Sequence, residues 1–187
     1  MRDGKERTSG FTVLELVVVL SIILALIALA IPAFTKWLPN YKLKGAAMDL
    51  YSRMQFAKSE AILANSQYAV IFDPGNERYK LVRSPGADLV FGAGGDDDQV
   101  EIIKVSDYGT GIVYGNGSAT KNMDDGTGIF PPDAVSFNNN MVVFNGNGLC
   151  DNSGYVYLQN DANRAYAVGA LASGVVRIKV WRGGDWQ

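Results

Sequence analysis

Glu15 is the residue whose position in this sequence most needs a chemical explanation. It is a single carboxylate near the start of a run of apolar residues that extends over 11–34. An ionised acid at the centre of a membrane helix costs about 2.5–3.5 kcal/mol on insertion scales, and less near an interface, so it normally has a partner. We therefore interpret Glu15 as a functional residue. The alternative, that headgroup water solvates it, stays open.

The remaining reactive side chains do not form a catalytic set. The sequence has no histidine, which removes the commonest general base and the commonest metal ligand. Serine and aspartate are plentiful, but no serine–lysine signature accompanies them. We predict neither an enzyme nor a cofactor. Cys150 is the single cysteine, so it cannot form an internal disulfide, and we expect it to be a buried small apolar side chain.

Two acidic, glycine-rich stretches carry the oxygen ligands that calcium prefers. Asp96, Asp97 and Asp98 form one, and Asp124-Asp125 with Asp133 form the other. Their spacing does not match an EF-hand loop. We interpret both as solvated turns and predict no metal site, with calcium left open as the alternative.

The elements that must position Glu15 are helical. Residues 1–10 are short and polar, and the apolar run after them nearly spans a hydrocarbon layer of roughly 30 Å. Beyond it, one helix face is apolar over about 41–66, at Leu43, Ala47, Leu50, Met54, Ala57, Ala61 and Ala64. We predict one helix from 11 to about 65, weakened or bent at Pro32 and Pro39, with its second half packed on a domain.

Residues 67–187 have the pattern of an antiparallel sheet joined by hairpins. Strands are predicted at 68–73, 78–83, 100–105, 135–137, 141–144, 155–158, 166–170 and 175–181, separated by turn signals. Residues 84–98 and 106–133 are rich in Gly, Asp and Pro, and we expect them to be long surface loops. The fold class is therefore α+β.

Charge does not fix the orientation or suggest a polyanionic partner. The formal net charge is −2, so no overall positive field attracts nucleic acid. Three basic residues flank the apolar run on each side, so the positive-inside rule is undecided.

The stretch Gly10-Phe-Thr-Val-Leu-Glu15, followed at once by the apolar run, resembles the processing site of type IV prepilins and type II secretion pseudopilins. The resemblance implies that a prepilin peptidase cuts between Gly10 and Phe11, and that Phe11 becomes an N-methylated amino terminus. It also implies that Glu15 pairs with the Phe11 ammonium of a neighbouring subunit, which satisfies both charges only on assembly. The family commonly has a helix-distorting proline where Pro32 stands.

Residues 49–62, 142–148 and 174–177 resemble the GspH/FimT branch of that family. The resemblance implies a pilin fold with a cleaved leader (1–10), a transmembrane and filament-core half-helix (11–40), an amphipathic half-helix (41–66) and a β-rich domain (67–187). It implies a minor pilin or pseudopilin in the inner membrane, with the domain periplasmic or extracellular. Its expected partners are prepilin peptidase, other pilin subunits and inner-membrane lipid.

Two other functions remain as alternatives. Arg177, Lys179 and Arg182 lie near two tryptophans, which would suit DNA uptake through phosphate attraction and base stacking, although we do not expect nucleic acid as the partner. Ala28-Leu-Ala30 satisfies the small-residue rule for ordinary signal peptidase, and cleavage after Ala30 would release a soluble secreted β domain.

Overall fold

The protein is represented by a computed structural model that describes residues 10–93 and 95–187. Helix α1 (Val13–Ala64) is continuous over 52 residues, which confirms the long helix predicted from the sequence. It runs without interruption through the positions of Pro32 and Pro39. The chain divides into two compact units, one ending at Leu38 and the other comprising Pro39–Gln187.

The second half of α1 is amphipathic in the way the spacing predicts. Leu43, Leu50, Met54, Ala57 and Ala61 are fully buried on one face. Ala64 had been assigned to that face, but it is exposed because the helix ends there and the chain leaves for the first strand. A helix of this length is stabilised mainly by packing of such a face on a core.

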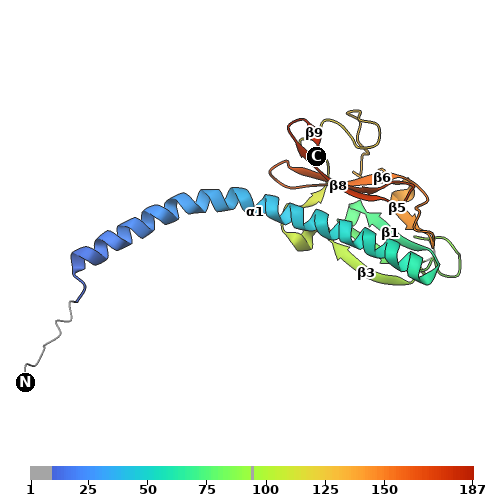
Figure 1. Ribbon diagram of the computed structural model, residues 1–187, viewed down its shortest axis with the longest axis horizontal. Helices are drawn as coiled ribbons and strands as arrows, with labels where there is room; N and C mark the ends of the chain where they lie inside the picture. The colour runs from blue at the N-terminus through green and yellow to red at the C-terminus, as the bar shows by residue number, and fades with distance from the viewer. Residues whose placement is uncertain (1–9, 94) are drawn as a thin grey trace, which may run out of the picture. The chain divides into compact units, whose positions relative to one another are not determined.

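The first sheet has the strand order β3-β2-β1-β5 and is antiparallel. Its strands are β1 (Tyr68–Asp73), β2 (Arg78–Val82), β3 (Gln99–Lys104) and β5 (Met141–Phe144). The Pro-Gly-Asn sequence predicts a turn between β1 and β2, and the structure has a short 3-10 helix there at Pro74–Asn76. The second half of α1 lies along this sheet (Figure 1).

The second sheet has the order β4-β6-β7-β8-β9 and is also antiparallel. Its strands are β4 (Val113–Tyr114), β6 (Gly154–Gln159), β7 (Ala165–Ala170), β8 (Val176–Arg182) and β9 (Asp185–Trp186). The sequence had suggested hairpins throughout. The turn after β5 instead leads the chain from the first sheet to the second. The strand predicted at 135–137 is not formed, and Val135 makes only an isolated bridge with Val156.

Three clusters of buried side chains hold the domain together. The largest lies between α1 and the inner faces of both sheets. The second covers the opposite face of the second sheet, and the third covers the outer face of the first sheet. The segments 84–98 and 106–133 are therefore more than surface loops, because Phe91, Ile112 and Ala119 are buried. The sequence analysis missed these buried side chains because the surrounding glycines and aspartates are typical of surface loops.

Candidate assembly surfaces

The start of α1 is capped by its own sequence. Thr12 immediately precedes the first helical residue, and the Glu15 backbone N–H donates to the Thr12 hydroxyl oxygen over 3.2 Å. A threonine followed three residues later by glutamate is the pattern of a capping box. The Glu15 carboxylate is exposed in this first turn and has no partner among the described residues. The sequence analysis missed the cap, although Thr12-Val-Leu-Glu15 was visible.

The first half of α1 presents apolar side chains on all sides. Val13–Ile31 is 19 residues long, and within the described chain it is the one segment long and apolar enough to cross a membrane by length and composition. None of this segment is buried by the rest of the protein. The apolar surface predicted from the sequence is therefore available to lipid or to another protein.

The second half of α1 carries apolar side chains on its outer face as well. Tyr41, Met48, Phe56 and Leu63 are exposed at successive spacings of seven, eight and seven residues, which places them on one stripe opposite the core. The small residues Gly45, Ser52 and Ser59 lie between them on the same stripe. We call these seven residues the outer stripe. A cleft of about 290 Å³ lies at its start, lined by Tyr41, Lys44, Gly45 and Met48.

A polar network fixes α1 to the first sheet beneath that stripe. The hydroxyl groups of Tyr79 and Tyr108 both donate to the Asp49 carboxylate, and Tyr79 does so over 2.9 Å. Arg53 bridges Asp49 and Glu101 on β3. Burial raises the pKa of Tyr79 far above its ordinary value. Burial and the bond to Asp49 raise the pKa of Tyr108 to about 12, so both phenols remain protonated donors.

Glycines allow the two sheets and α1 to meet closely. Gly174, in the β7–β8 turn, has φ of +73°, and a Cβ there would lie 1.8 Å from the carbonyl oxygen of Gly148. Lys58 on α1 donates from Nζ to the Gly174 carbonyl oxygen over 2.9 Å. A Cβ at Gly146 would similarly lie 2.6 Å from Asn65 Oδ1. Gly146, Gly148 and Gly174 are thus required for close packing, a role that the sequence alone did not reveal.

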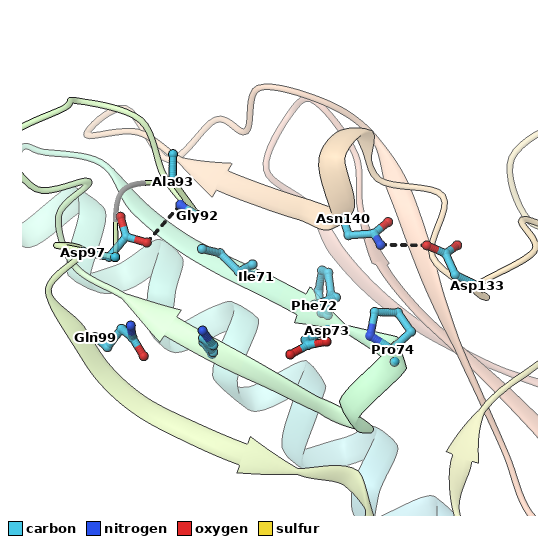
Figure 2. A pocket seen from close by; sticks show the side chains of 13 residues that line it. Ile71, Phe72, Asp73, Pro74, Gly92, Ala93, Asp97, Gln99, Asp133 and Asn140 are labelled. Carbon is cyan, nitrogen blue, oxygen red and sulfur yellow. Dashed lines mark hydrogen bonds between the residues drawn. The ribbon is translucent and has the colours of Figure 1, made fainter.

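A cleft of about 440 Å³ lies on the outer side of the first sheet, at β1 and the segment that follows β2 (Figure 2). On one side Asp97 accepts the Gly92 backbone N–H over 2.9 Å, and on the other the Asn140 side-chain amide donates to Asp133 over 2.7 Å. Among the residues that the structure describes, no three His, Cys, Asp or Glu side chains are grouped to hold a metal. The acidic turns are held by local hydrogen bonds.

The basic residues near the C-terminus do not form one surface. Because side chains alternate along a strand, Arg182 leaves β8 on the opposite face from Arg177 and Lys179. Trp181 and Trp186 are each only 9% exposed and pack against each other with ring centroids 5.3 Å apart. The Trp186 indole also donates to the Lys121 carbonyl oxygen. Neither ring offers a free face for base stacking.

Cys150 is buried, as the sequence analysis expected. Gly10 and Phe11 precede the helix and are exposed. The helical backbone is described at Pro32, and its side chain lies outside what the structure describes. Residues 1–9 of the expected leader also lie outside the described residues.

Comparisons with known proteins give one family and one fold. The family model described as "Type II transport protein GspH" matches residues 46–184. The minor pseudopilin EpsH from the type 2 secretion system of Vibrio cholerae has a similar structure, with a TM-score of 0.51 and 13% identity over 77% of this chain and 99% of that chain. The type IV minor pilin FimU of Pseudomonas aeruginosa aligns at a TM-score of 0.45 and 13% identity, over 79% of this chain and 94% of that chain. No curated protein matches the sequence. At this identity the likeness to EpsH is one of fold, α+β with a long helix on antiparallel sheets.

Proposed function

This chain belongs to the GspH family of type II transport proteins, and on that premise we propose that it is a minor pseudopilin. It is a structural subunit that assembles with other pilin-like subunits into an envelope filament of a type II secretion or pilus-like system. One observation carries the proposal. A 19-residue apolar segment that nothing else in the described chain covers continues, in the same helix, into a folded domain.

The apolar segment first serves as a membrane anchor. At about 1.5 Å per residue, Val13–Ile31 is nearly as long as the hydrocarbon layer is thick. In the precursor it holds the chain in the inner membrane, with the domain on the periplasmic side. Prepilin peptidase then cuts between Gly10 and Phe11, and the new amino terminus is methylated. These steps rest on the resemblance of residues 10–15 to prepilin sites and on the exposure of Gly10 and Phe11.

After processing, Glu15 pairs with the Phe11 ammonium of a neighbouring subunit. Both groups are costly to leave unpaired in an apolar environment, so pairing between subunits favours assembly and sets their axial register. The absence of a partner for the Glu15 carboxylate among the described residues supports this role. The outer stripe of the second half of α1 then contacts neighbouring subunits outside the membrane. Its four exposed apolar side chains support that contact.

The first test is the intact mass and amino-terminal sequence of the protein isolated from native membranes. We expect a chain that begins with N-methylated Phe11. A chain that begins at Ile31 would instead show cleavage by ordinary signal peptidase after Ala30 and a secreted domain. That result would remove the roles proposed for Glu15 and the apolar segment.

The second test separates charge pairing from helix capping, since Glu15 also belongs to the capping box. We expect Glu15→Ala to be processed normally but to be poorly incorporated into filaments isolated by shearing. Thr12→Ala is the matched control because it removes the cap and keeps the carboxylate, so it should be incorporated nearly as well as the wild type. Equal defects in both variants would assign Glu15 to capping and contradict the pairing.

A further inference from the structure

A cleft beside the end of β8 contains two arginines and no acid. Its volume is about 370 Å³, and it is lined by Ser118, Ala162, Asn163, Arg164, Trp181, Arg182 and Gly183. These residues come from three turns and the end of β8, which lie far apart in the sequence. The cleft is separate from α1 and from the surfaces assigned to assembly above.

The β7–β8 register places the two arginines at the same end of the strand pair. Tyr166 is opposite Val180. Arg164 lies two residues before Tyr166 and Arg182 two residues after Val180, so the register extended past the start of β7 places them opposite each other at this end of the strand pair. Like charges held opposite each other across a sheet destabilise it. An anion bound between the two guanidinium groups would replace this repulsion with two attractive contacts.

No side chain within the described residues neutralises these arginines. Within the described residues, the arginines that form ion pairs are Arg53, Arg78 and Arg83. The guanidinium groups of Arg164 and Arg182 form no hydrogen bond with any described residue. The two acids nearest in sequence, Asp161 and Asp185, form no ion pair with either arginine. Asp161 lies against Gly111, where an added Cβ would come within 1.9 Å of its Oδ2. Asp185 is opposite Arg182 across the β8–β9 hairpin, but its carboxylate accepts the Trp186 backbone N–H over 2.9 Å and makes no ion pair with Arg182.

We propose that Arg164 and Arg182 bind one oxyanion group, a carboxylate or a phosphate, in this cleft. Guanidinium groups present paired N–H donors that match the oxygens of either anion, and the Ser118 hydroxyl can supply a further donor. The site accepts a single group and not a polyanion, because Arg177 and Lys179 lie on the opposite face of β8 and do not continue it. It therefore differs from a nucleic-acid surface, and it does not depend on the function proposed above.

The experiment titrates the full chain, in uncharged maltoside micelles, with inorganic phosphate while chloride keeps the ionic strength constant. The side-chain Nε–H resonances of the arginines are followed by NMR. We expect saturable shifts for Arg164 and Arg182 and none for Arg177. Arg164→Gln and Arg182→Gln should each weaken phosphate binding by about tenfold, since each removes a charge-assisted hydrogen-bond donor. Arg177→Gln, on the same strand, is the matched control and should bind like the wild type.

Protein stability gives a reading that does not depend on the ligand. Without phosphate, neither glutamine variant should melt below the wild type, because no internal partner is lost. If either variant failed to fold, Arg164→Lys would keep the charge and lose the paired donors, and it should still weaken phosphate binding.

A parallel titration with acetate identifies the source of the anion. Saturation by both anions fits a carboxylate of a neighbouring protein chain, whereas saturation by phosphate alone fits a phosphoryl group. Absence of saturation with either anion, or equal weakening in Arg177→Gln, would overturn the proposal. So would a DNA duplex that binds with a steep salt dependence and is weakened equally by Arg177→Gln and Arg182→Gln, because that behaviour requires a continuous basic surface.

Discussion

The two halves of α1 share one helical backbone but differ in where their apolar surfaces find partners. In the second half, Leu43, Leu50 and Met54 pack on the two sheets of the same chain. In the first half, the large apolar side chains from Val13 to Ile31 are exposed. The difference shows that one helix can be stabilised by packing within the chain over one half while the apolar surface of the other half stays exposed. Four predictions test this contrast.

Alkaline pH should unfold the domain while the first half of α1 keeps its helical signal in micelles. Burial raises the pKa of Tyr79, and burial with the bond to Asp49 raises that of Tyr108 to about 12. Folded phenols therefore hold protons that the unfolded chain loses near pH 10, so this stability is complete below pH 10 and falls as pH rises towards 12. Tyr79 alone should cost roughly 1.4 kcal/mol for each pH unit above 10.

In a Trp37→Phe variant, which keeps only Trp181 and Trp186, tryptophan fluorescence reports the domain, and far-UV circular dichroism reports the helix. Residues 13–31 contain no tyrosine, so alkaline pH ionises no phenol in this segment. Simultaneous loss of both signals would contradict the independence of the two halves.

Matched leucine substitutions should separate the halves by folding energy. Leu50 is fully buried, whereas Leu24 is 66% exposed. Leu50→Ala should lower the free energy of unfolding of the domain by about 2–5 kcal/mol, through lost burial and the cavity left behind. Leu24→Ala should change it by less than about 0.5 kcal/mol. Urea denaturation in micelles measures both, and a comparable loss for Leu24→Ala would show that the first half contributes to domain stability.

A glycine pair should show how tightly the second half and the two sheets are joined. Gly174 and Gly183 both have positive φ, but an added Cβ meets the Gly148 carbonyl oxygen only at Gly174, and at Gly183 it meets nothing within 4 Å. Either change to alanine should cost about 1–2 kcal/mol of backbone strain. Gly174→Ala should cost a further 1–3 kcal/mol, roughly, for displacing the Gly148 turn. Equal melting temperatures for the two variants would argue against the close contact.

The smallest expected effect concerns the start of the first half. Thr12→Ala removes the hydroxyl that accepts the Glu15 N–H, which should cost about 1 kcal/mol of local helix stability. Amide exchange at residues 13–16 should accelerate, while the urea midpoint of the domain stays unchanged. A shifted midpoint would mean that helix capping and domain folding are coupled.

The parts of the fold that follow a regular period were predictable from the sequence. The strands Tyr68–Asp73 and Met141–Phe144 have the predicted bounds, and the helix differs from the prediction by two residues at its start. The division into two sheets was not predictable, because β6 and β7 are buried on both faces and their apolar runs do not show which face meets which partner. β4 and β9 were missed because two residues give no detectable alternation.

The candidate surfaces were predictable to different degrees. The sequence indicated Glu15 because a carboxylate in an apolar run is conspicuous. It grouped Arg182 with Arg177 and Lys179, and strand alternation separates them. Arg164 was not predicted as a site residue, because only the β7–β8 register brings it close to Arg182. Contacts between residues distant in sequence leave no local pattern.

The pairing of β1 with β5 also limits how fast the domain can form. Val70 is opposite Val142, so the first sheet cannot close until a long intervening segment has been brought back to it. Such non-local pairings raise the contact order of a protein, and domains that depend on them fold in milliseconds to seconds instead of microseconds. The second half of α1 must wait for that closure to bury its apolar face. A newly made chain would meanwhile expose this face and would be prone to aggregate until the sheet closes.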